Sequence, residues 1–279
     1  MIMRTSSVLI VGLLAGNAAF ADDHSQTTIY ALTGNGSSLL TLDDVTQTAN
    51  SQSYTLSEAL DAIAYRPVTG DLLGFSTAGE IYNVDTTSGE LTSLKALFAE
   101  EAVIAPGAVA FDFNNAIDAA RLVGAAGTNL VYFPDEFGDE RANQVLKFTD
   151  AFYGEGDVNE GVDPFIFANA YTNAIVGNKA ESTFQYALDA RTDALVSLAN
   201  NAGTLATVGG ITIDGQPADV LSAGGFDIVS PEAGMDKAYA ILQLEGSDTS
   251  GVYSIDLETA AATLISDLGV TDIVGFAAK

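Results

Sequence analysis

The chain of 279 residues has no cysteine, no tryptophan and a single histidine. Without cysteine it can form neither a disulfide framework nor a zinc or iron–sulfur centre held by thiolates. The histidine is residue 24, so the body of the chain cannot supply a Ser-His-Asp triad or a metal cage built from histidines. Chemistry that depends on thiol or imidazole side chains is therefore excluded for most of the molecule.

Basic residues are also scarce, with 10 Lys and Arg against 37 Asp and Glu and a net charge of −27. Binding to phosphate groups needs clustered Lys and Arg. We therefore expect no nucleic-acid partner and no attachment to an anionic membrane surface. At 48% hydrophobic and 17% charged residues, the composition is typical of a folded chain and not of a disordered one.

Residues 1–21 have the three parts of a secretory signal peptide: Arg4, an apolar run over residues 8–14, and the cleavage motif Ala19-Phe20-Ala21. The apolar run is too short to span a bilayer, which disfavours the alternative of an N-terminal anchor. We predict cleavage after Ala21, export to the periplasm or exterior of a bacterium, and no integral membrane segment in the mature chain. Residues 22–27 are predicted to be a disordered mature N-terminus.

Two phrases recur about every 50 residues, which indicates a repeat architecture. The first is a strand ending in Asp with Ser or Thr three residues later, which predicts a hairpin whose Asp side chain accepts backbone N–H groups. Its copies end at Asp43, Asp85, Asp189 and Asp256, and a degenerate copy has Pro134 at the Asp position. The second phrase is a small residue followed by an aromatic one: Ala64-Tyr65, Ala110-Phe111, Ala170-Tyr171, Gly225-Phe226 and Gly275-Phe276.

Each repeat thus predicts four antiparallel strands, which is one blade of a propeller. The last small–aromatic pair has no room for further strands, whereas residues 28–32 begin at a second strand. We therefore predict an all-β fold: one five-bladed β-propeller over residues 28–279, closed by pairing of its N- and C-terminal strands. A β-sandwich or a six-bladed ring is the alternative. Residues 94–103 and 143–152 are each predicted to hold one short helix.

Four phrases resemble a family of exported bacterial proteins known as domain of unknown function 4394, and the resemblance covers nearly the whole mature chain. They are Arg66-Pro67-Val68-Thr69-Gly70, Ala110-Phe111-Asp112-Phe113-Asn114 followed by Asp118 and Arg121, Gly156-Asp157-Val158-Asn159-Glu160-Gly161 followed by Pro164, and Ala170-Tyr171-Thr172-Asn173. The chain departs from the family pattern at Asn115, where Pro is usual, and at Ala119, where Arg is usual. The resemblance implies the propeller fold and supplies no activity.

Polar residues follow the small–aromatic pairs, at the ends of strands that would line the central tunnel. We predict that they converge around one tunnel mouth as a site for a small polar ligand or a cation. The candidate residues are Arg66, Asp112, Asn114, Arg121, Thr172, Asn173 and Asp227. The alternative is structural, with each Asp capping its own turn and Arg66 neutralising the carboxylates so that the blades hold together.

Two metal sites are further hypotheses. Asp157, Asn159 and Asp163 lie on an acidic, glycine-containing segment and offer the hard oxygen ligands that calcium takes, although the spacing departs from that of an EF-hand. Cleavage after Ala21 would leave Asp22, Asp23 and His24 at a free amine, a square-planar nitrogen set suited to copper or nickel. The alternatives are a solvated loop and an unstructured leader.

Three functions remain open. The first is a non-enzymatic module that binds a small molecule, cation or protein. The second is a glycan-active hydrolase that uses Asp112 and Asp227 with Glu58 or Glu80, and the third is a structural module of the cell envelope. The hydrolase requires two carboxyl groups facing an open cleft, whereas the structural module predicts fully bonded carboxylates inside a filled tunnel.

Overall fold

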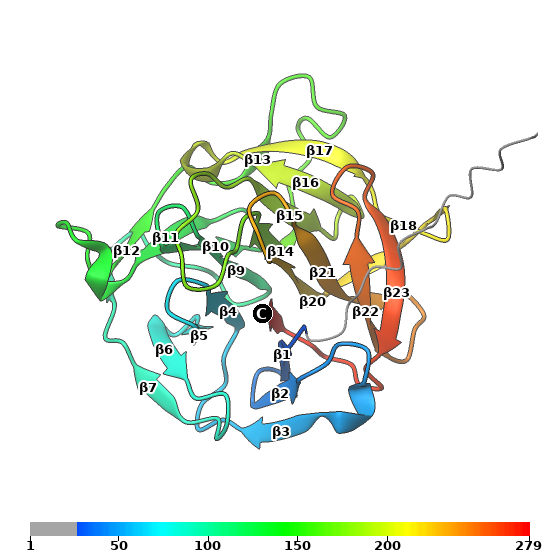
Figure 1. Cartoon of the computed structure of the whole chain (residues 1–279). Coiled ribbons are helices and arrows are strands. Elements are labelled where there is room, and N and C mark those ends of the chain that lie inside the picture. Colours follow the sequence, from blue (N-terminus) through cyan, green and yellow to red (C-terminus); the bar gives the residue numbers. More distant parts are fainter. Residues whose placement is uncertain (1–26) are drawn as a thin grey trace, which may run out of the picture.

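The computed structural model describes residues 27–279, which form five sheets arranged as blades around one axis (Figure 1). This confirms the predicted five-bladed β-propeller. The predicted signal peptide over residues 1–21 and the predicted copper or nickel ligands Asp22, Asp23 and His24 lie outside the described residues.

The blades are named in chain order, and their strands are given from the axis outward. Blade 1 consists of β24 (Gly275–Ala278), β1 (Ile29–Thr33), β2 (Ser38–Leu42) and β3 (Gln52–Thr55). Blade 2 consists of β4 (Ala62–Arg66), β5 (Asp71–Ser76), β6 (Glu80–Val84) and β7 (Leu91–Ser93). Blade 3 consists of β9 (Val109–Asn114), β10 (Ala119–Gly124), β11 (Asn129–Phe133), β12 (Gln144–Lys147) and β8 (Leu97–Phe98).

Blade 4 consists of β14 (Ile166–Tyr171), β15 (Gln185–Asp189), β16 (Ala194–Leu198), β17 (Thr204–Gly210) and β13 (Phe152–Tyr153). Blade 5 consists of β20 (Val220–Val229), β21 (Lys237–Leu244), β22 (Ser250–Ile255), β23 (Ala261–Asp267), β18 (Thr212–Ile213) and β19 (Gln216–Pro217). Three short 3₁₀ turns complete the described elements: η1 (Thr48–Asn50), η2 (Asp135–Phe137) and η3 (Asn200–Ala202).

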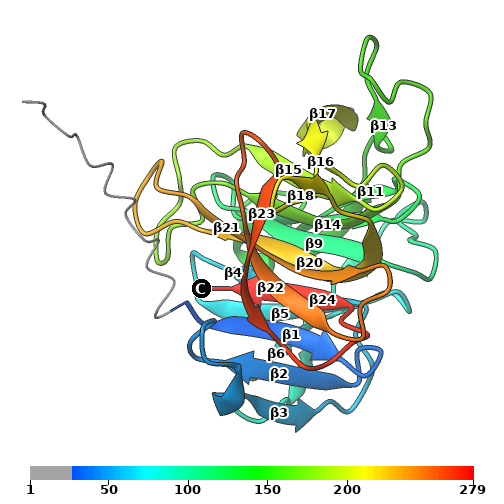
Figure 2. The ribbon, with the colours of Figure 1, turned by 90° about the vertical axis from the view of Figure 1, so that its right-hand side faces the viewer.

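Blade 1 is closed by strands from the two ends of the chain. β24 pairs antiparallel with β1, which places Phe276 opposite Ala31 and Ala277 opposite Tyr30 (Figure 2). Beyond these pairs, Lys279 exchanges two backbone hydrogen bonds with Thr28, at 2.9 and 3.0 Å. The inner strand of blade 1 thus comes from the last residues of the chain, as the repeat pattern predicts.

Five of the six hydrophobic clusters among the described residues lie between neighbouring blades, one for each pair, and the sixth lies within blade 3, around Phe133. The small–aromatic phrase explains this arrangement, because successive side chains of a strand point to opposite faces. In β20, Phe226 packs toward blade 4, whereas Gly225 faces Phe276 of blade 1. A Cβ built on Gly225 would lie 2.4 Å from the Cβ of Phe276, so only glycine fits at this contact.

The predicted Asp turns are present, with one change of residue. Asp85 accepts the N–H groups of Thr87 and Ser88 through Oδ1, at 2.8 and 3.0 Å. In the first repeat the acceptor is Asp44, whose Oδ1 lies 2.8 Å from the N–H of Thr46. The prediction that Asp43 makes this turn is therefore wrong by one residue.

The two predicted short helices are also absent from the structure. Residues 94–103 contain β8, and residues 143–152 contain β12 and the start of β13. These strands extend blades at their outer edges: Leu97 of β8 pairs in parallel with Gln144 of β12. In short apolar segments, the residue pattern of a helix cannot be distinguished from that of an outer strand that packs on one face.

None of the helical turns in the described range has the length and apolarity that a bilayer crossing requires.

Candidate functional site

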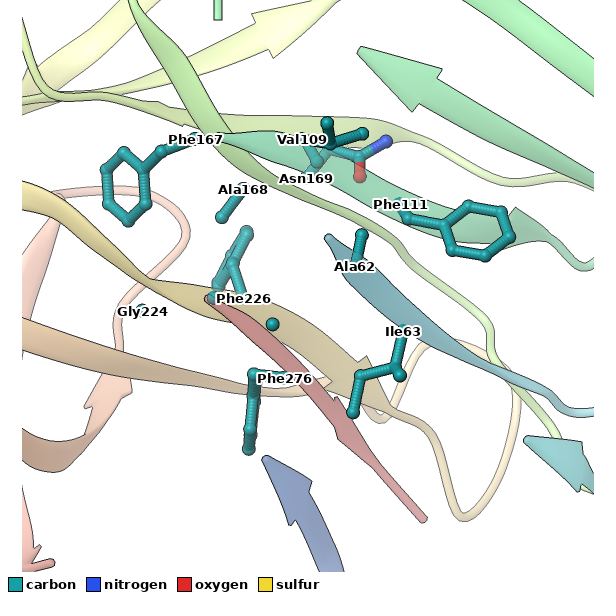
Figure 3. Close-up of a pocket in the computed structure, with 13 residues that line it drawn as sticks. Ala62, Ile63, Val109, Phe111, Phe167, Ala168, Asn169, Gly224, Phe226 and Phe276 are labelled. Atoms are coloured by element: carbon teal, nitrogen blue, oxygen red, sulfur yellow. The ribbon is translucent and has the colours of Figure 1, made fainter. Parts of the chain in front are cut away.

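The inner strands β4, β9, β14, β20 and β24 surround a tunnel that is almost completely filled. Ala62, Ala168 and Asn169 are among the residues that line it, and the void between them is about 10 Å³, whereas the ring of Phe111 points away from it (Figure 3). The buried amide of Asn169 borders this void and has no hydrogen-bond partner for either its oxygen or its nitrogen. The void has room for about one water molecule, so the tunnel itself cannot admit a larger ligand.

Asp112 and Asp227 use their carboxylates to tie neighbouring inner strands together. Oδ2 of Asp112 accepts the N–H of Tyr171 on β14, at 2.7 Å. Oδ2 of Asp227 accepts the N–H of Ala278 on β24, and Oδ1 accepts the N–H of Ile228, both at 2.7 Å. The two residues thus join blade 3 to blade 4 and blade 5 to blade 1 beside the axis.

The same two carboxyl groups titrate abnormally. Burial raises the pKa of Asp112 well above its ordinary value, and the negative charge of Asp227 raises it further. Burial also raises the pKa of Asp227, to about 7, against the opposing effect of its two backbone hydrogen bonds. Since two like charges in a buried site repel, the pair retains a proton at pH values where exposed carboxyls are ionised.

Arg66 pairs with neither of these carboxylates. Its guanidinium donates to both oxygens of Asp118, from Nε at 2.8 Å and from Nη2 at 2.7 Å. Its Nη1 donates to Glu136 at 3.2 Å. Because Asp118 and Glu136 belong to blade 3, Arg66 links blade 2 to blade 3, and the predicted neutralisation of Asp112 and Asp227 by Arg66 is wrong.

Arg121 lies between blades 3 and 4, inside a network of uncharged groups. It donates from Nε to the hydroxyl of Tyr171 at 2.8 Å, from Nη1 to the side-chain oxygen of Asn129, and from Nη2 to that of Asn201 at 2.8 Å. The guanidinium is buried, and all three acceptors come from protein. Its position is that of an interblade contact and not of an open binding site.

The other predicted residues hold a loop, residues 172–184, that we call the cap loop. Thr172 Oγ1 accepts the N–H of Phe184 at 2.8 Å, and Asn114 Oδ1 accepts the hydroxyl of Thr183 at 3.0 Å. Asn173 donates to the carbonyl of Ser182 at 2.9 Å.

The cap loop reaches three blades. The N–H of Gly177 donates to the carbonyl of Pro67 in blade 2 at 2.9 Å, and the N–H of Ala180 donates to that of Asn115 in blade 3 at 3.2 Å. The side-chain oxygen of Asn173 accepts the N–H of Gly234 in blade 5 at 2.7 Å. At the tunnel end where we predicted an open mouth lined by polar residues, the cap loop therefore bridges the blades.

The predicted calcium ligands lie on a loop that packs against β17. Asp157 accepts the N–H of Thr207 through Oδ2 at 2.6 Å, and through Oδ1 it accepts the Thr207 hydroxyl and the N–H of Asn159, both at 2.8 Å. Asp163 is exposed. Residues 27–279 contain no group of three acidic or histidine side chains placed to hold a metal ion. Calcium at this loop stays a prediction.

The carboxylates proposed for a hydrolase do not meet in a cleft. Asp112 and Asp227 are buried, and Oδ2 of Asp112 and both oxygens of Asp227 accept backbone N–H groups. Glu58 accepts the hydroxyl of Tyr82 at 2.8 Å, and Glu80 accepts the hydroxyl of Ser93 at 2.7 Å, both on blade 2. A hydrolase that uses these four residues has no site for its substrate between them.

One predicted residue, Arg66, does border an open cavity, of about 420 Å³, between blades 2 and 3; we call it the Arg66 cavity. Its polar walls include Arg66, Asp71, Asn83, Ser93, Lys95, Tyr132, Asp135, Glu136 and Asn143. The sequence analysis missed Asn83, Lys95, Tyr132 and Asn143, because each lies in a different strand or turn and no motif indicates that they meet.

Polar groups without a protein partner lie along these walls. The side-chain oxygen of Asn143 is buried without a partner. The hydroxyl of Tyr132 and the amide of Asn83 make no hydrogen bond with other described residues, although both border the cavity. Burial raises the pKa of Tyr132 to about 12, so its hydroxyl remains a donor at neutral pH. The cavity thus combines a fixed guanidinium with uncharged donors and acceptors.

A comparison with solved structures gives matches at low sequence identity. A chain of a nidogen/laminin complex is 11% identical, with a TM-score of 0.49, and the match covers 90% of this chain and 98% of that one. A putative 6-phosphogluconolactonase from Bacteroides uniformis is 14% identical, with a TM-score of 0.42 and coverages of 92% and 100%. An auxiliary nutrient binding protein from Bacteroides ovatus is 12% identical, with a TM-score of 0.43, and the match covers 76% of this chain and 55% of that one.

No curated protein sequence matches the chain. The family model described as "Domain of unknown function (DUF4394)" matches residues 38–277, a range that begins at β2 in blade 1 and ends within β24 of the same blade. The match therefore covers blades 2 to 5 in full, together with β2, β3 and most of β24 in blade 1, and the chain belongs to this family.

Proposed function

We propose that this protein is an exported, non-enzymatic propeller that binds a small polar molecule in the Arg66 cavity. The observation that carries the proposal is a cavity of about 420 Å³ whose walls include hydrogen-bonding groups without protein partners, on Tyr132 and Asn83. This volume lies within the range of small-molecule sites, and such sites use a few convergent polar groups to orient their ligand.

The charges around the cavity indicate what kind of molecule it accepts. Arg66 is already paired with Asp118 and Glu136, and the cavity is also lined by Lys95, Asp71 and Asp135. With cations and carboxylates both present, neither a strongly anionic nor a strongly cationic ligand is favoured. We infer an uncharged or zwitterionic molecule with several hydroxyl, amide or amino groups.

Export is the second part of the proposal. It rests on the charged, apolar and small-residue segments of residues 1–21, which match the order found in secretory signal peptides. In that setting the ligand would be a solute of the periplasm or the surrounding medium. Fractionation of cells that produce the full chain tests this part, and recovery of uncleaved protein in the cytoplasm would contradict it.

Thermal unfolding tests the cavity. The probes are neutral monosaccharides and zwitterionic amino acids, added one at a time to the mature protein recovered after export. A ligand present at ten times its Kd stabilises the folded state by about 1.4 kcal/mol, which raises Tm by roughly 3–6 °C in a domain of this size. We expect at least one probe to produce such a rise.

Two variants identify the site of that effect. Tyr132→Phe removes a hydroxyl without a protein partner, and Asn83→Ala removes an amide without one, so neither should lower stability much. Both should reduce the ligand-induced rise, whereas Thr263→Ala, on the exposed surface of β23, should leave it unchanged. The proposal is wrong if no probe raises Tm, or if the rise is the same in both cavity variants as in the unmodified protein.

A further inference from the structure

The tunnel has a second end, where the inner strands begin. The cap loop follows the last residue of β14, Tyr171, whereas a cavity of about 330 Å³ lies beside the first residues of the inner strands. We call this cavity the far mouth. All five blades line it, through Asn35 and Val274 of blade 1, Asp61 of blade 2, Ala108 of blade 3, Phe167 of blade 4 and Ser222 of blade 5. Phe167 and Gly224 also border the small void near Asn169, so the far mouth leads toward the filled tunnel (Figure 3).

Two strand ladders are irregular at the far mouth. The pairing of β14 with β15 shifts register between Ile166 and Ala168, and that of β20 with β21 shifts between Val220 and Gly224. Phe167 and Ser222 lie in these two irregular segments, and both border the far mouth. The inner ladders of blades 1, 2 and 3 keep a regular register. Since β-bulges re-aim side chains and are common next to binding sites, the irregular segments mark this end of the tunnel.

Asp61 is the one charged residue on the far mouth within residues 27–279. Its carboxylate is held from one side, because Oδ2 accepts the N–H of Thr77 at 2.6 Å and the hydroxyl of the same residue at 2.9 Å. Its backbone N–H donates to the carbonyl of Phe75 at 2.8 Å. Oδ1 makes no hydrogen bond with a described residue, and protein does not enclose it. One oxygen of a fixed carboxylate is therefore open to a ligand.

Two uncharged side chains accompany this carboxylate. Asn35 and Ser222 are exposed, and their side chains make no hydrogen bond with other described residues. They belong to blades 1 and 5, which precede blade 2 around the ring, so the three polar residues come from consecutive blades. The apolar part of the lining includes Leu60, Ala108 and Val274. The far mouth thus combines one anionic and two neutral acceptors with an apolar wall.

The charge of the far mouth favours a cation. In the part of the chain that the structure describes, no lysine or arginine lines it. The surface cavity that shares Ser222 with it has one cation and one anion, Arg191 and Asp219, and so leaves the balance unchanged. A carboxylate without a basic partner attracts cations, and a net charge of −27 strengthens the attraction. Calcium takes six to eight oxygen ligands, whereas a primary ammonium donates only three hydrogen bonds and tolerates an apolar wall beside it.

We propose that the far mouth binds a small primary amine with a short apolar chain, in its ammonium form. The ammonium donates to Oδ1 of Asp61 and to the side chains of Asn35 and Ser222, and the chain lies against Ala108 and Val274. The volume is at the small end of the range for ligand sites, and the filled tunnel below leaves no room for a long chain. This site is separate from the Arg66 cavity, since no residue borders both, and goes beyond the function proposed for that cavity.

Isothermal titration calorimetry of the mature protein with butylamine near neutral pH tests the proposal. We expect one saturable site and at least tenfold weaker binding of butanol and butanoate, which have a similar chain without the positive charge. Asp61→Asn keeps the shape of the side chain and an oxygen for Thr77 but removes the charge, so it should weaken binding about tenfold or more. Asp85→Asn is the matched control, because Asp85 likewise accepts the N–H and hydroxyl of one threonine, Thr87, and it should bind butylamine as the unmodified protein does.

A second pair of variants leaves Asp61 in place. Ser222→Lys puts an ammonium on an exposed position of the far mouth and should abolish butylamine binding. Ser53→Lys, on the exposed outer strand β3, should have no effect. Absence of butylamine binding, equally tight binding of butanol, or undiminished binding to either Asp61→Asn or Ser222→Lys would overturn the proposal. Because these variants leave the lining of the Arg66 cavity unchanged, the two proposals succeed or fail separately.

Discussion

The contact between Gly225 and Phe276 gives the most direct test of how the blades pack. In the variant Gly225→Ala, the new Cβ would lie 2.4 Å from the Cβ, 2.8 Å from the backbone nitrogen and 3.1 Å from the Cα of Phe276. Two of these three atoms belong to the main chain of β24, so no change of rotamer can relieve the contact. The inner strands of blades 5 and 1 must move apart.

The expected cost follows from that geometry. Overpacking a well-packed core by one methyl group costs about 1–3 kcal/mol, and a contact with backbone belongs at the upper end of this range. For a domain of this size, a loss of about 3 kcal/mol lowers Tm by roughly 6–12 °C. Urea unfolding followed by circular dichroism should show a lower midpoint with an unchanged m value.

Gly210→Ala is the matched control. It lies in β17, and the nearest atom to its new Cβ is the carbonyl oxygen of Asp193 at 4.0 Å. Alanine loses less conformational freedom than glycine on folding, so this variant should be as stable as the original protein or slightly more stable. If Gly225→Ala were as stable as Gly210→Ala, the explanation of the small–aromatic phrase as an interblade contact would be refuted.

The remaining predictions concern charged groups. Folding raises the pKa of Asp112 and Asp227, so the protonated pair favours the folded state; its contribution is complete below their ordinary pKa and is lost as the pH rises through the raised values. The free energy of unfolding from urea titrations should therefore fall between about pH 4 and pH 8, and Asp112→Asn should flatten this slope; an equal slope in the variant would contradict the assignment. Arg66→Met leaves the buried Asp118 carboxylate without its partner and should cost about 3 kcal/mol in the same assay. Glu136→Gln, at a side chain that is 71% exposed, should lower the free energy of unfolding by less than about 1 kcal/mol. Similar losses in both variants would show that the buried ion pair of Arg66 stabilises the fold no more than the exposed one. Asp157→Ala should lower Tm even in EDTA because it removes the acceptor for the Thr207 backbone, whereas the calcium hypothesis predicts an additional rise with calcium that only the unmodified protein shows.

The ring of blades was predictable because its signals are local and repeated. The Asp turns and the small–aromatic pairs each arise from contacts that every blade must make, so the same residues recur along the chain. Asp85 and Asp256 both accept N–H groups two and three residues ahead, as a local turn requires. Closure was predictable from the count of strands at the two ends of the chain.

The candidate site was only partly predictable, because its contacts are made between distant residues that do not repeat. The position of Arg66 at the end of an inner strand gives no sign that Asp118 and Glu136 will pair with it. The cap loop has no repeat signal either, yet it bridges the tunnel end through bonds such as Gly177 to Pro67. Cavities next to such loops depend on where a single segment crosses the surface, and periodicity carries no information about that.

The pairing of β1 with β24 also determines when the molecule can become complete. During synthesis, β1 leaves the ribosome with β2 and β3, but its inner neighbour β24 is made only after the strands of the four other blades. Until then, one edge of β1 has no partner, and a nascent chain with such an edge is prone to pair with other chains. The ring can close only once β24 has been made, so a binding partner that recognises the closed ring cannot engage a chain that still lacks this strand.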